Sequence, residues 1–490
     1  MSGHGIRERL LVLLVAALGT SAIRGQTLEL IALETDLKLP YQDLTEADMD
    51  GDGRKDLFFA LADPPRWEIR LRLPGNAGFG PPRVIPVPDG VAAIALARVV
   101  PPAGYDIVTL AADGLAVIPG GAGGNGKPRP WCRVDLLFPP GHRGVPHHWT
   151  WGDDIDGDGR QDVFVPGLEG DLLVRGGADG KPAGPPERMP GPPTRVVRRR
   201  TGRGLVEVRR MRPRSELARL YSGASVPAWL GRDGLYAVPR TPTGFAAPMN
   251  LFPLKARAQA GLGILRRTDV DLTDLNGDKV CDLVLTRTEA KGGTFPDRRT
   301  DLLFFKNTGQ PARAPAQVLL LPGVLSSGPD VGDVNGDGIA DLFLSVFAGD
   351  VKSEALRRMF GFRVTLDYHL YLGTGGARAP FPRSPTLSLS DKVDNRTFET
   401  WSLRHRRVLS HDWNGDGILD LVDFKADAKT CTVTVTYGKT EAGRYELGDA
   451  TTEFTWTGKV TGYGVVSMGE GAAAARLKTA TGVVYVTAKR

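Results

Sequence analysis

The chain has 490 residues, of which 41% are hydrophobic and 24% charged, with a formal net charge of +6. This much apolar material can build a packed core, which excludes a wholly disordered chain. The 62 glycines and 37 prolines exceed what a helical protein usually contains, so the composition favours short strands joined by tight turns. Three cysteines, Cys132, Cys281 and Cys431, are too few for a disulfide framework.

Residues 1–25 have the plan of a secretory signal peptide. Arg7 and Arg9 precede the apolar run from Leu10 to Leu18, small residues follow, and we expect cleavage after Ala22 or Gly25. The apolar run is too short to cross a bilayer as a helix. We therefore expect residues 26–490 to form a secreted protein, extracellular or periplasmic, with no membrane span.

A nine-residue pattern then occurs five times, each time directly before a short apolar run. It reads Asp, any residue, Asp or Asn, Gly, Asp, usually Gly, two further residues and Asp, and it gathers 17 of the 56 acidic residues. Crowded carboxylates repel one another unless a cation lies among them. Hard oxygen donors at alternating positions suit calcium better than zinc or copper. We expect about four or five Ca²⁺ ions, with backbone carbonyls contributed near the seventh position. The predicted metal residues are Asp48, Asp50, Asp52, Arg54 and Asp56; Asp154, Asp156, Asp158, Arg160 and Asp162; Asp274, Asn276, Asp278, Val280 and Asp282; Asp333, Asn335, Asp337, Ile339 and Asp341; and Asp412, Asn414, Asp416, Ile418 and Asp420.

Two other interpretations of these loops have to be weighed. An EF-hand needs Glu at its twelfth position and a helix on each side. The twelfth residues here are not Glu, and each loop runs straight into an apolar stretch of strand length, such as Leu57-Phe58-Phe59. Plain Asp/Gly turns without metal are the second alternative. They are most plausible for the loop that begins at Asp274, where Lys279 replaces the second glycine.

An apolar strand ending in a glycine-rich turn follows each loop, and it occurs seven times in all. Two of the seven units, around Tyr105–Val108 and Val226–Trp229, lack the acidic loop, which indicates two repeats that have lost the metal. Units of four short strands cannot bury their own faces, and their radial repetition predicts an all-β propeller. Three strands near the C-terminus lack a fourth, and residues 28–33 form a strand without a unit. Pairing them closes a ring of eight blades, and seven blades is the alternative.

These nonapeptides and glycine-ended strands, such as Tyr371-Leu372-Gly373-Thr374-Gly375, resemble those of the FG-GAP or VCBS repeat proteins, whose blades also build integrin alpha-subunit propellers. The resemblance covers the mature chain. It implies a β-propeller with calcium held in hairpin loops on one face. It implies little about activity, because the family includes adhesion proteins, lectin-like binders and accessory domains of enzymes. Two or three units lack the loop, so a full calcium complement is not implied.

Other features suggest chemistry beyond calcium. The stretch Arg195–Arg214 holds nine arginines and one glutamate, a net +8, and can bind an acidic polysaccharide or phosphate-rich surface. The alternative is an exposed edge strand protected by charge, with Val196, Val197, Val206 and Val208 facing inward. The cluster His142, His147, His148 and Trp149 is either a catalytic or metal site or a turn that leads into a strand. Of the eight tryptophans, which either bind sugar rings or pack between blades, Trp413 is expected to be the most exposed.

The sequence thus predicts a secreted, monomeric, calcium-stabilised propeller that acts as a non-catalytic binding or adhesion module. Its expected partner is a glycan or an extracellular protein, and not nucleic acid. Arg195–Arg214 would favour an acidic partner. No Ser-His-Asp order, phosphate-binding glycine loop or HExxH motif is recognisable. The alternative is a polysaccharide hydrolase or lyase that uses the central funnel, since paired carboxylates leave no spacing signature.

Overall fold

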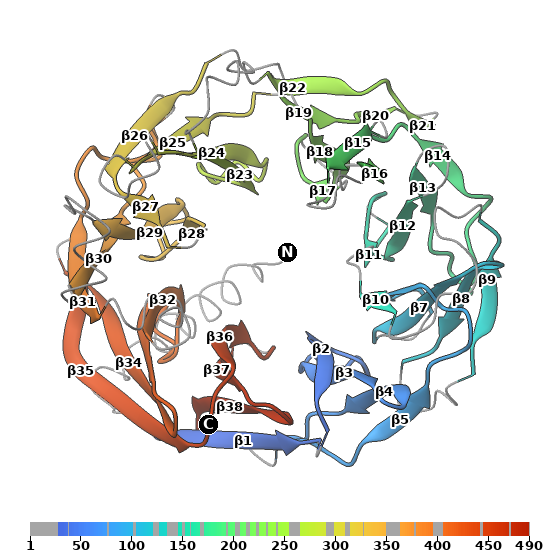
Figure 1. Cartoon of the computed structure of the whole chain (residues 1–490), viewed down its shortest axis with the longest axis horizontal. Coiled ribbons are helices and arrows are strands. Elements are labelled where there is room, and N and C mark those ends of the chain that lie inside the picture. Colours follow the sequence, from blue (N-terminus) through green and yellow to red (C-terminus); the bar gives the residue numbers. More distant parts are fainter. Residues whose placement is uncertain are drawn as a thin grey trace, which may run out of the picture.

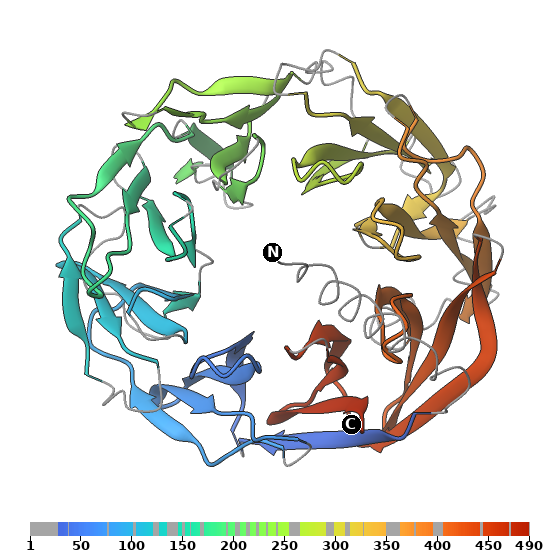
Figure 2. The same cartoon turned by 180° about the vertical axis from the view of Figure 1, so that it is seen from behind.

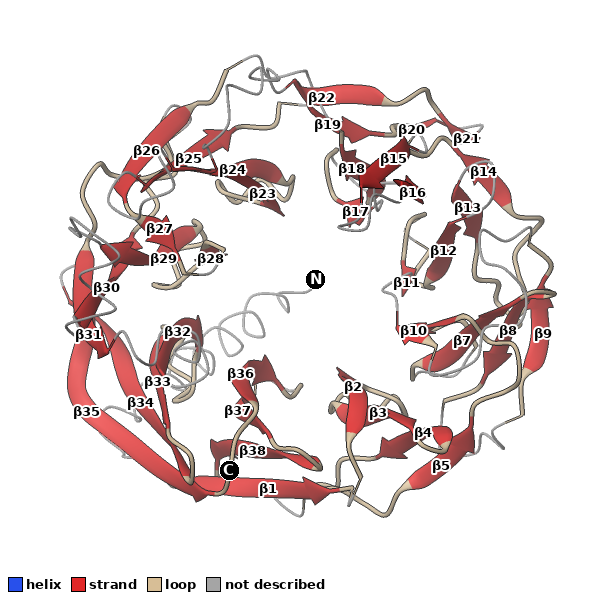
Figure 3. Cartoon of the chain, in the orientation of Figure 1, coloured by secondary structure: helices blue, strands red, loops and turns tan. Residues whose placement is uncertain are grey.

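A computed structural model shows a ring of eight β-sheets around a central axis (Figure 1). It describes residues 28–37, 39–75, 78–100, 104–120, 127–134, 146–148, 152–156, 158–166, 171–192, 195–200, 206–211, 216–221, 225–231, 234–241, 244–253, 265–290, 298–308, 314–326, 328–348, 363–376, 379–394, 405–441, 444–469 and 472–489. Within these ranges the regular structure is strand throughout, with no helix (Figure 3). The expected all-β propeller of eight blades is confirmed, and the alternative of seven blades is wrong.

Each blade is named here by its place along the chain, and its strands are given from the axis outwards. Blade 1 is β2 (Tyr41–Ala47), β3 (Asp56–Ala62), β4 (Pro65–Arg70) and β5 (Arg83–Pro86); blade 2 is β6 (Ala93–Ala97), β7 (Asp106–Ala111), β8 (Gly114–Ile118) and β9 (Arg129–Cys132), with β10 (His147–His148) paired to the inner side of β6; blade 3 is β11 (Gly152–Asp153), β12 (Asp162–Pro166), β13 (Asp171–Val174) and β14 (Glu187–Met189); blade 4 is β17 (Glu216–Ala218), β18 (Val226–Leu230), β19 (Gly234–Ala237) and β22 (Met249–Pro253).

The second half of the ring is built in the same way. Blade 5 is β23 (Leu265–Thr273), β24 (Asp282–Ala290), β25 (Arg298–Phe305) and β26 (Gln317–Pro322); blade 6 is β27 (Val324–Leu325) and β28 (Asp330–Gly332), both paired to β29 (Asp341–Ala348), followed by β30 (Arg363–Tyr371) and β31 (Leu387–Asp394); blade 7 is β32 (His405–His411), β33 (Asp420–Ala426), β34 (Thr430–Glu441) and β35 (Arg444–Thr457); blade 8 is β36 (Gly462–Ser467), β37 (Ala473–Lys478), β38 (Gly482–Ala488) and β1 (Leu30–Asp36).

Two small hairpins lie outside the blades. They are β15 (Arg195–Arg200) with β16 (Val206–Met211), and β20 (Arg240–Thr241) with β21 (Gly244–Phe245). The β15–β16 hairpin follows the outermost strand of blade 3 and precedes the innermost strand of blade 4. It pairs with neither blade, so this stretch is not an edge strand of a blade, and its two strands are the edges of a two-stranded sheet of their own.

The ring is closed by strands from opposite ends of the chain. β1 pairs with β38 in an antiparallel register that runs from Leu30 opposite Ala488 to Asp36 opposite Gly482. It thereby supplies the outermost strand of a blade whose other strands come from the C-terminus (Figure 2). The predicted closing strand is confirmed.

The hydrophobic core is divided among the spaces between neighbouring blades. The second strand of a blade is buried on both faces, and in β3 the residues from Leu57 to Leu61 are all at most 1% exposed. One cluster joins Phe58 and Trp67 of blade 1 to Ile94 and Ile107 of blade 2. Similar clusters join most other neighbours, so each blade depends on the next for burial of its apolar faces.

The alternation of strand direction fixes which connections share a face of the disc. Each acidic loop joins the first strand of a blade to its second, so all five loops emerge on one face. The turn between the third and fourth strands emerges there too. The connections from one blade to the next, including the one that carries β15 and β16, lie on the opposite face. Among the described residues, no helix is long and apolar enough to cross a membrane.

Candidate metal-binding loops

The five nonapeptides all occupy the same position, between the first and second strands of blades 1, 3, 5, 6 and 7. We call them by their first residues: the Asp48, Asp154, Asp274, Asp333 and Asp412 loops. Each chain segment turns around its own carboxylates. In the Asp48 loop, Oδ1 of Asp48 accepts the N–H of Gly51 at 2.6 Å and Oδ2 accepts that of Gly53 at 3.2 Å. The other loops bond the first carboxylate to their turn in a similar way.

The third and fifth residues complete the turn. Their side-chain oxygens accept N–H groups two residues further along, as Asp416 accepts the N–H of Ile418 at 2.9 Å. The predicted seventh residues, Arg54, Arg160, Val280, Ile339 and Ile418, each donate their backbone N–H to the fifth residue. The oxygen donors of each loop are therefore held close together by the backbone that they cap.

In two loops the carboxylates approach one another closely enough to share one cation. Carboxylate oxygens of Asp48, Asp50 and Asp52 lie within 4.8 Å of one another, and so do those of Asp154, Asp156 and Asp162. A set of hard carboxylate oxygens fits Ca²⁺ or Mg²⁺ and does not fit a metal that prefers sulfur or nitrogen. These acidic clusters can therefore hold a metal ion.

The ninth residue of each loop is buried, and it has a structural role that the sequence reasoning missed. In the Asp412 loop, Oδ2 of Asp420 accepts the N–H of Trp413 at 2.7 Å, and Oδ1 accepts that of Gly438, at an irregularity within the third strand, at 2.8 Å. Asp56, Asp162, Asp282 and Asp341 make the same pair of bonds in their blades. This carboxylate therefore joins the acidic loop to the third strand or to the turn that follows it.

In blades 6 and 7 the residue that donates to Oδ1 of the ninth carboxylate is glycine, for a steric reason. A Cβ at Gly438 would lie 2.3 Å from the carbonyl oxygen of Leu419, the eighth residue of the loop. Gly373 faces Ala340 in the same way at 2.3 Å. Glycine occurs at these two positions because a side chain there would collide with the backbone of the acidic loop.

Burial changes the acidity of the ninth residues. It raises the pKa of Asp56 and of Asp420 to about 7, opposed by the backbone N–H groups that each accepts. Burial also raises the pKa of Asp162, Asp282 and Asp341 to about 6. Neighbouring carboxylates of the same loop add to the shift in every case. A cation bound in the loop would oppose this shift.

Blade 2 has no acidic loop, but it keeps the hydrogen bonds of the ninth carboxylate. Asp106 stands at the ninth position, and its carboxylate accepts the N–H groups of Val99, Val100 and Gly120 at 2.8 to 3.1 Å. Arg98 stands where the first Asp would be, and its guanidinium lies 3.1 Å from Oδ2 of Asp48 in the adjacent loop. Alignment of Tyr105-Asp106 with Lys55-Asp56 would have revealed both residues in the sequence.

Arginines partner the loops of the first half of the ring. Arg54 pairs with Asp52, Arg98 with Asp48, and Arg160 with Asp158. Arg175 lies 3.9 Å from Asp156. In the Asp333 and Asp412 loops the seventh residue is isoleucine, and no described residue forms an ion pair with their first or fifth carboxylates. Among the described residues, the Asp333 and Asp412 loops therefore lack the arginine partners found at the Asp48 and Asp154 loops.

Neighbouring loops are joined to one another around the axis. The N–H of the eighth residue donates to a backbone carbonyl of the preceding blade: Lys55 to Met468, Tyr105 to Asp48, Gln161 to Arg98, Cys281 to Arg219, and Leu419 to Val334. A Cβ at Gly336 would lie 2.9 Å from the carbonyl oxygen of Gly417 in the next loop. The loops form a nearly continuous belt, so a change in one loop reaches the next.

The second residue of each loop anchors it in the core. Met49, Ile155, Leu275, Val334 and Trp413 occupy this position, and each is at most 4% exposed. Trp413 packs with Phe424 and Val484 in the cluster between blades 7 and 8. The expectation that Trp413 would be the most exposed tryptophan is wrong, because this position points into the space between blades and not to solvent.

The histidine cluster is only partly within the described residues. His148 Nδ1 lies 3.3 Å from a carboxylate oxygen of Asp43 and 3.1 Å from the hydroxyl of Thr45, both on the innermost strand of blade 1. The interaction with His148 lowers the pKa of Asp43. His142 and Trp149 lie outside the described residues, as does the predicted signal peptide.

Comparison with known proteins adds a family match. A model of the FG-GAP-like repeat matches residues 274–344, which contain the Asp274 and Asp333 loops and the strands between them. The chain thus contains an FG-GAP-like repeat within an eight-bladed propeller. A search of curated proteins finds no match.

Among solved structures, the chain is similar to a lectin of Agrocybe aegerita. The structure of that lectin was reported for its specific recognition of non-reducing terminal N-acetylglucosamine. The two are 13% identical over 86% of each chain, with a TM-score of 0.38. A likeness this distant carries no argument about the ligand of this propeller.

Proposed function

We propose that this propeller is a secreted, calcium-stabilised binding module without catalytic activity, and that it recognises a glycan or an extracellular protein. The observation that carries the proposal is the belt of five acidic loops, each joined by its ninth carboxylate to the same blade and by its eighth N–H or glycine contact to a neighbour. Such a belt would let bound cations stiffen the whole ring and present a rigid surface.

Calcium is the cation that we propose for these loops, with about four or five ions bound. The donors are hard oxygens, and the extracellular setting expected from residues 1–25 supplies calcium. The Asp333 and Asp412 loops would gain most from a cation, because no arginine among the described residues pairs with their first or fifth carboxylates. Where Arg98 and Arg54 already partner the Asp48 loop, the gain would be smaller.

One observation supports the second candidate, a polysaccharide hydrolase or lyase. Asp43, Thr45 and His148 gather on the inner strands near the axis, where titratable groups could act on a bound chain. Both short contacts involve the same nitrogen of His148, however, so the cluster does not form a nucleophile, histidine and carboxylate in sequence. We therefore place catalysis second.

A glycan array and a turnover assay, both run in millimolar calcium, distinguish these functions. The binding-module proposal predicts retention of a glycan or an extracellular protein, with no release of reducing ends or unsaturated products from the polysaccharides bound. Turnover that is lost in the variant His148→Ala would establish the enzyme instead. If the protein showed no binding and no turnover, both proposed functions would be contradicted.

A further inference from the structure

We infer that the β15–β16 hairpin is an anion-binding arm whose ligand is an acidic polysaccharide. The inference rests on the proposed function, since it names a ligand class for the binding module. Its basis is the place of the hairpin in the fold, the register of its two strands and the charge of its sequence.

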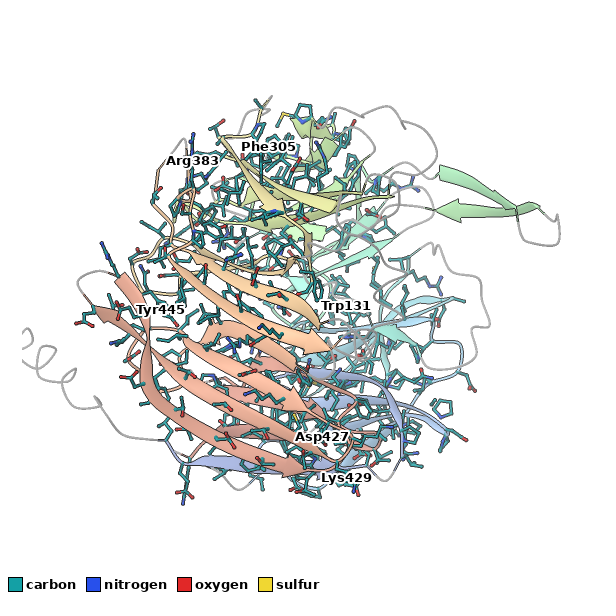
Figure 4. The ribbon with its side chains drawn as sticks, turned by 60° about the vertical axis from the view of Figure 1, so that its left-hand side comes forward. Trp131, Phe305, Arg383, Asp427, Lys429 and Tyr445 are labelled. Atoms are coloured by element: carbon teal, nitrogen blue, oxygen red, sulfur yellow. The ribbon has the colours of Figure 1, made fainter. Side chains whose placement is uncertain are left out.

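The hairpin is separate from the packed ring. It is inserted in the connection between blades 3 and 4 and forms a two-stranded sheet of its own. In Figure 4 the green ribbon stands clear of the body of the disc. A ribbon that contributes no strand to a blade is not needed to complete the sheet of that blade.

The hairpin lies on the face of the disc opposite the acidic loops. Figure 4 shows this in blade 7: Tyr445, whose hydroxyl donates to Leu419 in the Asp412 loop, lies at one side of the disc, and Asp427 and Lys429 lie at the other, toward the hairpin. The arginine-rich ribbon and the acidic loops therefore lie on opposite faces of the disc.

The charge of the ribbon is large and divided between both faces. Its twelve paired residues include six arginines and one glutamate, a net +5. Residues opposite each other in an antiparallel pair share a face, as do alternate residues of one strand. Face A therefore holds Arg198, Arg200 and Arg210, and face B holds Arg195, Arg199 and Arg209 together with Glu207.

The register also changes the interpretation of the valines. Val196, Val206 and Val208 belong to face A with its three arginines, whereas Val197 belongs to face B. The four valines do not form one apolar face, so the expectation that all four face inward is wrong. Neither face has the composition of a surface that packs on a core.

These features fit an acidic polysaccharide better than other polyanions. Arginine pairs in bidentate fashion with carboxylate and sulfate groups. The ribbon has no aromatic residue, and stacking on aromatics is what single-stranded nucleic acid binders use. A ribbon in a duplex groove presents one face to the bases, whereas here the arginines are shared equally by both faces. A thin linear polymer can lie along either face.

The test compares two triple variants that remove equal charge. One is Arg198→Ser, Arg200→Ser and Arg210→Ser on face A; the other is Arg195→Ser, Arg199→Ser and Arg209→Ser on face B. The control is Lys392→Ser, Lys429→Ser and Lys459→Ser, which removes three exposed charges elsewhere. Binding of the full mature chain to fluorescent polygalacturonate, a sulfated dextran, neutral dextran and duplex DNA is measured at low and high salt, and thermal unfolding checks that each variant folds.

We expect the protein to bind one or both acidic polymers, and neutral dextran not at all. The face A variant should bind about tenfold more weakly, the face B variant less so because Glu207 already offsets one of its charges, and the control should bind like the parent. The variants should also show a smaller loss of affinity on addition of salt.

Other results overturn the inference in distinguishable ways. Equal affinity in the parent and both variants would remove the hairpin from the site and leave the binding-module proposal standing. Tighter binding to duplex DNA would replace the ligand class. Binding only to neutral glycans, or self-association through the hairpin in sedimentation experiments, would overturn the anionic polysaccharide as partner. Cleavage of the polymer would contradict the non-catalytic proposal while leaving the role of the arm intact.

Discussion

The ninth carboxylate of each unit explains why aspartate and glycine recur together in this sequence. Asp106 shows the structural part of this role in isolation, since its blade has no acidic loop around it. An aspartate that would usually be assigned to metal binding here also supplies the bond between two turns of one blade. The two roles need separate tests.

Replacement of Asp106 with alanine should lower the free energy of unfolding by about 3 kcal/mol, with or without calcium. Three backbone N–H groups, those of Val99, Val100 and Gly120, lose their acceptor, and each buried unpaired donor costs about 1 to 3 kcal/mol. Relief of the buried charge offsets part of that cost. Urea unfolding measures it, with Asp113→Ala in the exposed turn of the same blade as control. A change below about 1 kcal/mol would show that Asp106 has no such role.

The raised pKa values of the ninth residues predict an unusual pH dependence in chelator. These carboxyls have folded pKa values of about 6 to 7, above those of the unfolded chain, so the folded state binds protons more tightly. Their contribution to stability is present at low pH and is lost as the pH rises through 6 to 7. The urea midpoint in chelator should therefore fall between pH 5 and pH 8. A midpoint that rises over this range would contradict the assignment.

Lys279 occupies a backbone conformation that suits glycine. It has a φ of 65°, where the other loops have glycine at the sixth position, as with Gly338 at 81°. The substitution Lys279→Gly relieves a backbone strain of about 1 to 2 kcal/mol. Glycine also gives the unfolded chain more conformational freedom, which offsets about 0.4 to 1 kcal/mol of that gain in stability. We expect a net stabilisation of about 0.5 kcal/mol by thermal unfolding. Gly338→Ala is the converse control: no atom lies within 4 Å of the added Cβ, so its destabilisation would report φ alone.

At the scale of strands and loops, much of the blade could be predicted from the sequence. The apolar run after each loop and the glycine-ended third strand mark two strands and the turns around them, because both patterns arise from contacts within one blade. The two units without acidic loops were found for the same reason, and β7 and β18 stand where Tyr105–Val108 and Val226–Trp229 indicated.

The contacts between blades could not be predicted in this way. Arg98 reaches Asp48 across a blade boundary, and Trp413 is buried by strands far along the chain. The position of β15–β16 outside the sheets likewise depends on which strands already complete blades 3 and 4. The alternation of apolar and polar residues predicts which face of a strand is buried, but it does not identify the neighbouring blade against which that face packs.

The role of β1 in closing the ring can be tested by deleting the strand. Deletion of residues 28–36 removes the whole β1–β38 pairing, leaves β38 as the outer edge of blade 8, and uncovers the cluster that contains Leu33 and Tyr485. The truncated protein should melt well below the parent and aggregate through the exposed edge of β38. Differential scanning calorimetry and light scattering measure both effects. A truncated protein as stable and monomeric as the parent would mean that β1 does not close the ring.

At the scale of the molecule, eight blades share their cores in pairs, and the acidic loops are linked around one face. Stability is therefore a property of the closed ring, in which each blade buries the apolar face of its neighbour. A cation bound in one loop would act on the next through the contacts between loops, such as that between Gly336 and Gly417.

The central claim is that the acidic loops bind calcium and that this stabilises the propeller. Thermal unfolding of the mature protein in chelator, in millimolar calcium and in millimolar magnesium tests it most directly. One site at a free calcium concentration 100 times its dissociation constant adds about 2.7 kcal/mol, so several sites should raise the melting temperature clearly. We predict a large rise with calcium and little with magnesium. An unchanged melting temperature in calcium would contradict the claim and would leave the loops as turns held by their own carboxylates.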